Sequence, residues 1–414
     1  MNRRMHQGLR IALGGLLLAQ ATGAVTLTEV PVATWKGSVN LPSYAKMYVY
    51  VPAKLAAKPP IVVSNHSCGS TASGQAGNMT KFLAASDKNG FLMIFPDNPG
   101  QNCWDVGTKA ALTHDGGGDP HAIATMVRYA LKKYNGDSSR VYVVGGSSGA
   151  MMTQALLGVY PEMFMAGAPR AGVPCGCWAE SYASSNQWSS PCASGTVTKT
   201  AQQWGDYVRA INPSYKGHRP RVQIYHGESD QTISFNNFGE GIKEWTNVLG
   251  LSTTPTSTSK PTTPAYTYNR QTWKNSCGVA VLDAWSAPGQ PHSMTYEEDT
   301  IMKFFGLQTA DSKDPEAACN SGIEAAKPTT SPVSYLRQDQ ALVLDGNGAD
   351  KVDVKIWNTS GQIQYGSTIQ VGAHSAAVSV GLSALQSGYY LASATYLRSG
   401  RVTGRSNMRF VVVP

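Results

Sequence analysis

The sequence contains no uninterrupted apolar run of the roughly 20 residues that a membrane-spanning helix requires. An apolar stretch near its start, residues 11–18, is too short to cross a bilayer and follows three arginines. Small residues come next, with candidate cleavage sites after Ala21 and Ala24. This pattern predicts a secretory signal over residues 1–24. We therefore expect an exported protein, extracellular or periplasmic, without a membrane span.

Clusters of basic residues are also absent. The formal charge of +8 falls to +5 when Arg3, Arg4 and Arg10 of the signal are left out, and the remaining charges are spread along the chain. This distribution gives no indication of a nucleic-acid partner, so we expect none. We expect the protein to act as a monomer.

A zinc-binding pattern is missing as well. All seven cysteines follow the predicted signal, and an exported chain permits disulfides between them. The odd number leaves one thiol unpaired. Cys175 and Cys177 are separated by a single glycine, but no histidine stands at zinc-ligand spacing beside them. We expect no metal and no other cofactor.

The sequence does contain a glycine-rich turn, residues 145–149, between two apolar segments. The preceding residues 141–144 have the character of a buried strand, and the apolar residues after the turn have helical spacing. The pattern G-x-S-x-G places Ser147 at the apex of a strand-turn-helix, which exposes its Oγ as a nucleophile. A phosphate loop, the alternative for such a turn, needs a following lysine, and none is present.

Strands and helices alternate as far as residue 307. Apolar patterns predict strands at residues 47–51, 61–65, 90–96, 141–144, 164–168, 222–225, 266–273 and 279–285, and helices at residues 79–86, 119–134, 150–157, 242–249 and 296–305. Long loops are expected at residues 172–195 and 251–263. This alternation predicts an α/β catalytic domain over residues 25–307, with a mostly parallel sheet and helices on both faces.

The composition changes after the last predicted helix. Residues 308–332 are rich in Ala, Ser, Thr, Pro and Lys, which is typical of a linker. Short alternating strands with Gly or Asn turns follow, and they predict a small β-sandwich accessory domain over residues 333–414. Its aromatic residues include Trp357, Tyr365, Tyr389 and Tyr390. They could bind a polysaccharide, because aromatic rings stack on sugars. We favour the interpretation that they are core and edge-strand residues of a spacer domain.

A nucleophilic serine needs a base and an acid that orients the base. In an open parallel sheet both are expected at the carboxyl ends of strands. Asp230 and His292 follow two such predicted strands, and the chain order Ser147, Asp230, His292 is that of an α/β-hydrolase. We prefer them over rivals that lie elsewhere in the pattern: His66, His114, His121, His218 and His226 for the base, and Asp283 and Asp299 for the acid.

The tetrahedral intermediate of ester hydrolysis also needs two N–H donors for its oxyanion. We predict the backbone N–H of Ser148, directly after the nucleophile, as the first donor. The second is expected from the loop after the strand 61–65, at Ser67 or Cys68. His66 in the same loop is interpreted as a residue that shapes the loop.

Taken together, these motifs resemble those of the secreted carbohydrate esterases of family one, the acetylxylan and feruloyl esterases, which are related to extracellular polyhydroxybutyrate depolymerases. The resemblance covers about residues 27–307 and depends on several motifs in order. They are His66-x-Cys68, Asn102-Cys103-Trp104-Asp105, residues 113–119 (THDGGGD), residues 145–153 (GGSSGAMMT), Tyr160-Pro161, His226-Gly227-x-x-Asp230 and Gly289-x-x-His292.

The resemblance implies an α/β-hydrolase fold with Ser147 as nucleophile, His292 as base and Asp230 as its partner. It also implies two disulfides, Cys68–Cys103 and Cys177–Cys192; we expect a third between Cys277 and Cys319, which leaves Cys175 as the odd thiol. The sequence departs from the family where Ser67, Gly69 and Ser70 replace a fuller glycine run, and in the domain after Pro332.

The function implied is an exported serine esterase that removes acyl groups from plant xylan. We favour acetyl over feruloyl esters, because the stretches GGSSGAMMT and TH-x-GGGD look most like acetylxylan esterases. We also expect Trp104, Asp105 and His66 to contact the substrate. The alternatives are a polyhydroxybutyrate depolymerase, whose accessory domain binds the polymer, and a carbohydrate-binding protein without catalysis.

Overall fold

The structure is a computed structural model that describes residues 26–181, 188–213 and 215–317 and, beyond these, residues 334–336, 341–345, 350–358, 362–370, 377–381, 385, 388–399 and 401–412. The predicted signal and most of the predicted linker lie outside the described residues. The chain divides into two units. The first comprises the described residues up to Asn275 together with residues 280–312, and the second comprises residues 276–279 and the described residues from Lys313 onward.

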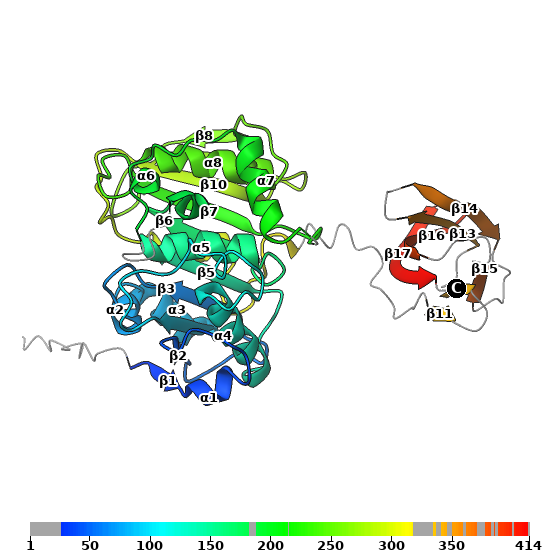
Figure 1. Cartoon of the computed structure of the whole chain (residues 1–414), viewed down its shortest axis with the longest axis horizontal. Coiled ribbons are helices and arrows are strands. Elements are labelled where there is room, and N and C mark those ends of the chain that lie inside the picture. Colours follow the sequence, from blue (N-terminus) through cyan, green and yellow to red (C-terminus); the bar gives the residue numbers. More distant parts are fainter. Residues whose placement is uncertain are drawn as a thin grey trace, which may run out of the picture. The chain divides into compact units, whose positions relative to one another are not determined.

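The first unit is built on a ten-stranded sheet (Figure 1). Its six central strands are parallel, in the order β4 (Leu92–Asp97), β3 (Ile61–Asn65), β5 (Val141–Gly146), β6 (Ala166–Arg170), β7 (Arg221–Gly227) and β10 (Ala280–Ala287). Antiparallel strands extend both edges: β2 (Lys46–Tyr50) and β1 (Thr28–Val30) beside β4, and β9 (Asn269–Lys274) and β8 (Ser257–Ser259) beside β10.

Helices cover both faces of this sheet because its central strands are apolar on both sides. In β5, Val141 and Val143 belong to one apolar cluster and Tyr142 and Val144 to another on the opposite face. The first cluster includes side chains of α1 (Val32–Trp35), α4 (Asp119–Lys133), α5 (Ser148–Val159), α7 (Ala201–Ile211) and α8 (Asn236–Val248). The second includes those of α2 (Ala72–Gly77), α3 (Thr80–Asn89) and α9 (Glu298–Phe305). The predicted α/β-hydrolase fold is confirmed.

The predicted elements recur with shifted ends. Helix α8 begins six residues before its predicted start. The predicted loop over residues 172–195 contains the 3-10 helix η1 (Cys177–Ser181) and the short helix α6 (Ser190–Ala193). Helix α7 was not predicted, although its first turn carries a capping box of Thr200 and Gln203 that marks a helix start. It packs on α8, where Trp204 Nε1 donates to Glu240 Oε2 at 2.8 Å.

The second unit contains two antiparallel sheets. One has the order β11 (Ser334–Leu336), β12 (Ala341–Asp345), β15 (Ala377–Gly381), and the other has the order β14 (Ile363–Gln370), β13 (Lys351–Asn358), β16 (Gly388–Arg398), β17 (Arg401–Val412). Strand β13 alternates as predicted: Val352, Val354 and Ile356 are buried, whereas Trp357 is half-buried. A small all-β unit at this end of the chain is therefore confirmed.

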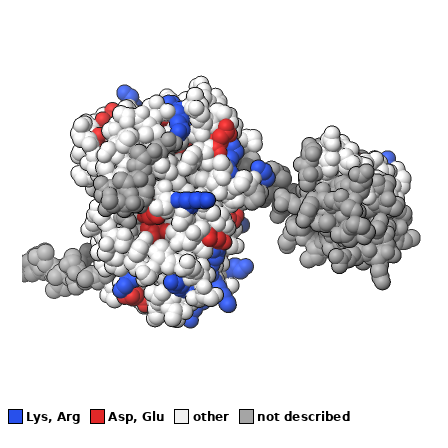
Figure 2. Space-filling model, in the orientation of Figure 1, with Lys and Arg blue, Asp and Glu red and all other residues white. Residues whose placement is uncertain are grey.

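Charged side chains are scattered over the visible face of the described residues, without a broad patch of one sign (Figure 2). No helix within the described ranges is long and apolar enough to cross a membrane. The carboxyl ends of the parallel strands are the part of the fold that concerns function, because the predicted site residues follow them.

Candidate active site

The turn after β5 holds Ser147 in a conformation that few side chains adopt. Its φ of 56° and ψ of −122° lie outside the regions that ordinary residues prefer. A Cβ on Gly145 would lie 2.2 Å from the Gly149 carbonyl oxygen, and a Cβ on Gly149 would lie 2.2 Å from that of Asn65. Both glycines are therefore required for strand, turn and helix to pack this closely, and the serine is forced to the apex.

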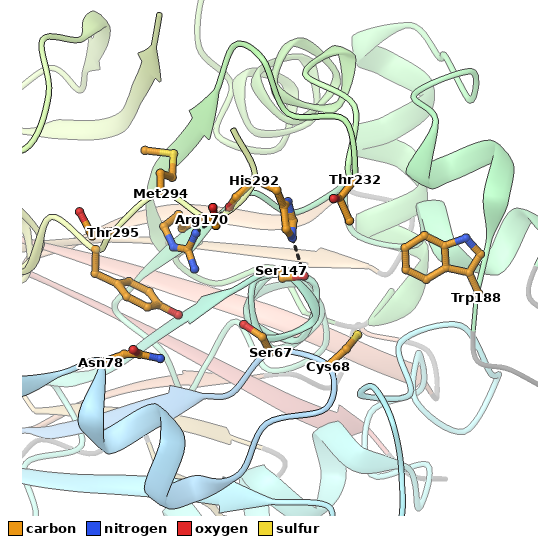
Figure 3. Close-up of a pocket in the computed structure, with 12 residues that line it drawn as sticks. Ser67, Cys68, Asn78, Ser147, Arg170, Trp188, Thr232, His292, Met294 and Thr295 are labelled. Atoms are coloured by element: carbon orange, nitrogen blue, oxygen red, sulfur yellow. Dashed lines mark hydrogen bonds between the residues drawn. The ribbon is translucent and has the colours of Figure 1, made fainter. Parts of the chain in front are cut away.

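The three residues predicted to act together do lie together. His292 Nε2 is 2.9 Å from Ser147 Oγ, and His292 Nδ1 is 2.7 Å from Asp230 Oδ2 (Figure 3 draws the first of these contacts). Asp230 follows β7 and His292 follows β10, and these two parallel strands are neighbours in the sheet. The side chains thus form a continuous hydrogen-bonded chain from a carboxylate through an imidazole to a hydroxyl.

Asp230 is buried and accepts several hydrogen bonds. The backbone N–H groups of Thr232 and Ile233 both donate to Oδ1 at 2.9 Å, while His292 contacts Oδ2. Burial by itself raises the pKa of the Asp230 carboxyl, but the hydrogen bonds from His226, His292 and Ile233 outweigh it and hold that pKa well below its usual range. Asp230 therefore stays ionised beside the imidazole.

A second histidine, His226, touches the same carboxylate. Its Nε2 lies 3.2 Å from Asp230 Oδ2 and 2.9 Å from the Ile233 carbonyl oxygen, and its side chain is buried. Because one ring nitrogen serves both acceptors and does not reach Ser147, His226 is arranged to fix the loop that carries Asp230. His292, in contrast, is partly exposed and lies between Asp230 and Ser147.

Four of the other rival residues have partners of their own. His114 Nε2 contacts Glu162 at 2.8 Å, and His121 lies 3.3 Å from Asp115. Asp283 is buried in β10, where Gln223, Arg270, Thr272 and Trp285 all donate to it. Asp299 forms an ion pair with Lys81 on the surface. None of these residues lines the cleft at Ser147.

Two of the residues predicted to supply an oxyanion donor, Ser67 and Cys68, lie on the opposite side of Ser147 from His292 (Figure 3). Ser148 is the first residue of α5, so its N–H has no partner within the helix. Ser67 and Cys68 line the cleft, and Ser67 Oγ donates to the Gly146 carbonyl at 3.0 Å. The next N–H, that of Gly69, is engaged with the Asn102 carbonyl at 2.7 Å. This leaves the N–H groups of Ser67 and Cys68 as the second-donor candidates.

Disulfides stabilise the loops around the cleft. The predicted Cys68–Cys103 and Cys177–Cys192 bridges are both present, and Cys175 is a free, buried thiol. Cys277 is disulfide-bonded. Because Cys319 lies outside the described residues, its pairing with Cys277 stays a prediction.

The structure does not bring Trp104, Asp105 or His66 into the cleft, so their predicted contact with substrate has no support. Trp104 is buried and donates from Nε1 to the His66 carbonyl and from its backbone N–H to Ser148 Oγ, both at 2.8 Å. The Asp105 carboxylate accepts the N–H groups of the turn that follows it, and His66 is fully buried. Trp104 and His66 thus support the oxyanion loop from its buried side, whereas Asp105 orders the turn that follows it. The motif spacing could not reveal this arrangement.

A cleft of about 520 Å³ opens above Ser147. In Figure 3, Trp188 and Thr232 lie toward one end, and Asn78, Arg170 and Thr295 lie toward the other. Arg170 was not predicted, although it ends the strand β6 and therefore reaches the same edge of the sheet as the other site residues. Tyr296 and Met294 also line the cleft and come from the loop after His292. Within the described residues, no cluster of His, Cys, Asp and Glu is arranged to hold a metal ion.

This arrangement contains the groups that ester hydrolysis requires. His292 is placed to accept the Ser147 proton, Asp230 to stabilise the imidazolium that results, and two backbone N–H groups to bind an oxyanion. The geometry therefore fits acyl transfer to a serine followed by hydrolysis.

Known proteins with similar sequences are esterases. Residues 43–240 match the family described as "Esterase PHB depolymerase". "Acetylxylan esterase A" of Aspergillus oryzae is 39% identical over 267 residues, which are 64% of this chain and 85% of that protein. "Acetylxylan esterase" of Coprinopsis cinerea is 41% identical over 271 residues, 65% of this chain and 71% of that protein.

The fold comparison agrees. The structure titled "Acetyl xylan esterase from Aspergillus awamori" is 38% identical, covers 68% of this chain and 100% of its own, and superposes with a TM-score of 0.62. The resemblance inferred from the motifs is thereby confirmed. This chain belongs to the esterase PHB depolymerase family and is a carboxylic ester hydrolase with an α/β-hydrolase fold.

Proposed function

We propose that this protein removes acetyl groups from xylan through an acyl-enzyme on Ser147. The observation that carries the proposal is the hydrogen-bonded chain from Asp230 through His292 to Ser147 Oγ, which opens into the cleft. We infer the substrate, acetylated xylan, from the similarity of this chain to acetylxylan esterases over most of their length.

In the proposed reaction, Ser147 Oγ attacks the acetyl carbonyl as His292 Nε2 takes its proton. The negative charge that develops on the carbonyl oxygen is stabilised by the N–H of Ser148 and by that of Cys68 or Ser67. The imidazolium, stabilised by Asp230, then protonates the departing sugar oxygen. Water, activated by the same imidazole, releases acetate from Ser147.

The proposal extends to the whole chain. Residues 1–24 direct export and are removed, residues 25–307 form the catalytic domain, residues 308–332 link it to the accessory domain, and residues 333–414 form that domain. Intact mass and N-terminal sequencing of the exported protein test the first of these assignments. An N-terminus that retains residues 1–24 would contradict it.

The catalytic proposal is tested by Ser147→Ala, with the exposed edge-strand variant Ser257→Ala as control. We expect Ser147→Ala to lower kcat by roughly 10⁴- to 10⁶-fold and the control to behave as wild type. The substrate proposal is tested by comparing acetate release from acetylated xylan with ferulate release from feruloylated xylan and with clearing of polyhydroxybutyrate films. Activity on the polyester alone would overturn it, as would near-normal hydrolysis by Ser147→Ala.

A further inference from the structure

Arg170 is a buried cation in the wall of the cleft. The residue is only 9% exposed, yet it lines the cleft together with Ser147 and His292. It forms no ion pair with a carboxylate of any described residue, and no carboxylate is among the lining residues. An unpaired buried charge destabilises a fold unless something compensates for the lost hydration. The wall of the cleft thus holds an unbalanced positive charge next to the nucleophile.

The guanidinium is held in one orientation. Nη1 donates to the His292 carbonyl at 3.1 Å, and the group lies over the Tyr296 ring, 4.6 Å from its centroid. Nε has no hydrogen-bond partner among the described residues, and no bond from Nη2 to them is found. Nη2 is therefore a fixed donor without a partner among the described residues, whereas Nε is shielded from solvent.

Two further donors lie beside it. A Cβ on Gly146 would lie 2.3 Å from Arg170 Nη2 and 2.7 Å from Tyr296 Oη. Both groups therefore pack against Gly146, the residue before Ser147. Gln75 Nε2 donates to Tyr296 Oη at 3.2 Å, which leaves the phenol hydrogen free to donate. Asn78, which is exposed, lines the same end of the cleft (Figure 3).

We propose that Arg170 and the Tyr296 hydroxyl, with Asn78 at the rim, form a carboxylate-binding subsite beside Ser147. Guanidinium and carboxylate are complementary in charge, and a guanidinium that is already held in one orientation loses little entropy when it binds one. The inference rests on the proposed function, because the carboxylate that a xylan esterase meets there is a uronic-acid substituent next to the acetylated sugar. The same chemistry also fits the carboxylate of the released acid.

The test compares two matched substrates, an acetylated xylo-oligosaccharide that carries a glucuronosyl group and the same compound with that carboxyl reduced to an alcohol. We expect wild type to show a kcat/KM about tenfold higher for the acid, since a hydrogen bond between charged groups is stronger than one between neutral groups. Arg170→Gln is expected to bring the ratio near one, and Tyr296→Phe to lower it by a smaller factor. Lys132→Gln, which removes an exposed charge from α4, should leave the ratio unchanged.

The second arm measures inhibition by acetate on the neutral substrate. If acetate inhibits Arg170→Gln more weakly than wild type, and wild type shows the same kcat/KM for the acid and the alcohol substrate, the subsite binds the released acid. A wild-type ratio of one with acetate inhibition that Arg170→Gln does not change overturns the proposal. Raising the ionic strength with wild-type enzyme gives the same test without a variant, because salt weakens the preference for the acid. If the neutral oligosaccharide is not deacetylated at all, it is the proposed function that fails.

Discussion

The two sides of Ser147 are fixed by different kinds of interaction. On the base side, Asp230 and His292 are held by hydrogen bonds to ionisable groups, and His226 adds a further contact to the same carboxylate. On the oxyanion side, the Cys68–Cys103 disulfide and neutral hydrogen bonds, such as that from Ser67 Oγ to the Gly146 carbonyl, hold the loop. The base must exchange a proton during the reaction, whereas the oxyanion donors only need to stay in place. The base side is therefore held by ionisable hydrogen-bond partners, and the oxyanion side by a disulfide and neutral hydrogen bonds.

The largest effect is expected on the base side. Two histidines contact Asp230 there, and variants of each distinguish proton transfer by His292 from positioning by His226. His292→Ala is expected to lower kcat by about 10⁴- to 10⁶-fold, since among the described residues only His292 forms a side-chain hydrogen bond with Ser147 Oγ. His226→Gln is expected to lower it only about tenfold, because this ring acts through Asp230. Steady-state kinetics on p-nitrophenyl acetate measures both, and equal losses would remove the distinction.

Asp230→Asn is expected to lower kcat about 10⁴-fold, as in other triad hydrolases, because the amide favours the wrong imidazole tautomer.

A comparison of the stability of Asp230→Asn with that of wild type also tests whether the pKa of the Asp230 carboxyl is depressed. A carboxyl with a depressed pKa in the folded state adds stability above its unfolded pKa of about 3.9, and that stability is lost as the pH falls through the folded pKa. The free energy of unfolding of wild type should therefore approach that of Asp230→Asn below about pH 4. A stability difference that does not change with pH would contradict the depressed pKa.

On the oxyanion side, replacing Cys68 and Cys103 together by serine is expected to lower kcat about 10- to 100-fold, less than the loss of a whole oxyanion donor. The same variant should lose about 2–4 kcal/mol of unfolding free energy. The matched control replaces Cys177 and Cys192, whose sulfurs do not line the cleft, although the loop between them carries Trp188. We expect it to lose stability but to retain most of kcat, as measured by chemical denaturation and by kinetics.

The smallest effect is expected from Ser67→Ala, which removes the hydroxyl bond to Gly146. A neutral hydrogen bond contributes about 0.5–1.5 kcal/mol, so kcat should fall by a factor of roughly 2 to 10. The pH dependence of kcat/KM should stay as in wild type, because no ionisable group is touched. A shifted pH profile would show that the two sides are not independent.

Local sequence patterns determined the central strands, most of the longer helices and the position of the nucleophile, but they missed α7 and the short strand β8. The strand β5, the glycines around Ser147 and the helix α5 are specified within about 20 residues, because the pattern of burial and the need for glycine are local properties. The order Ser147, Asp230, His292 followed from the rule that parallel strands end at one edge of the sheet.

Only the tertiary structure distinguished residues that share the same sequence context. His226 lies near the end of β7, His292 follows β10, and both touch Asp230, so the contact with Ser147 separates their roles. Trp104 belongs to a motif near the site but is buried behind the oxyanion loop, whereas Arg170, which no motif marks, faces the cleft. Side-chain direction and long-range packing decide these cases, and neither is encoded in the spacing of residues along the chain.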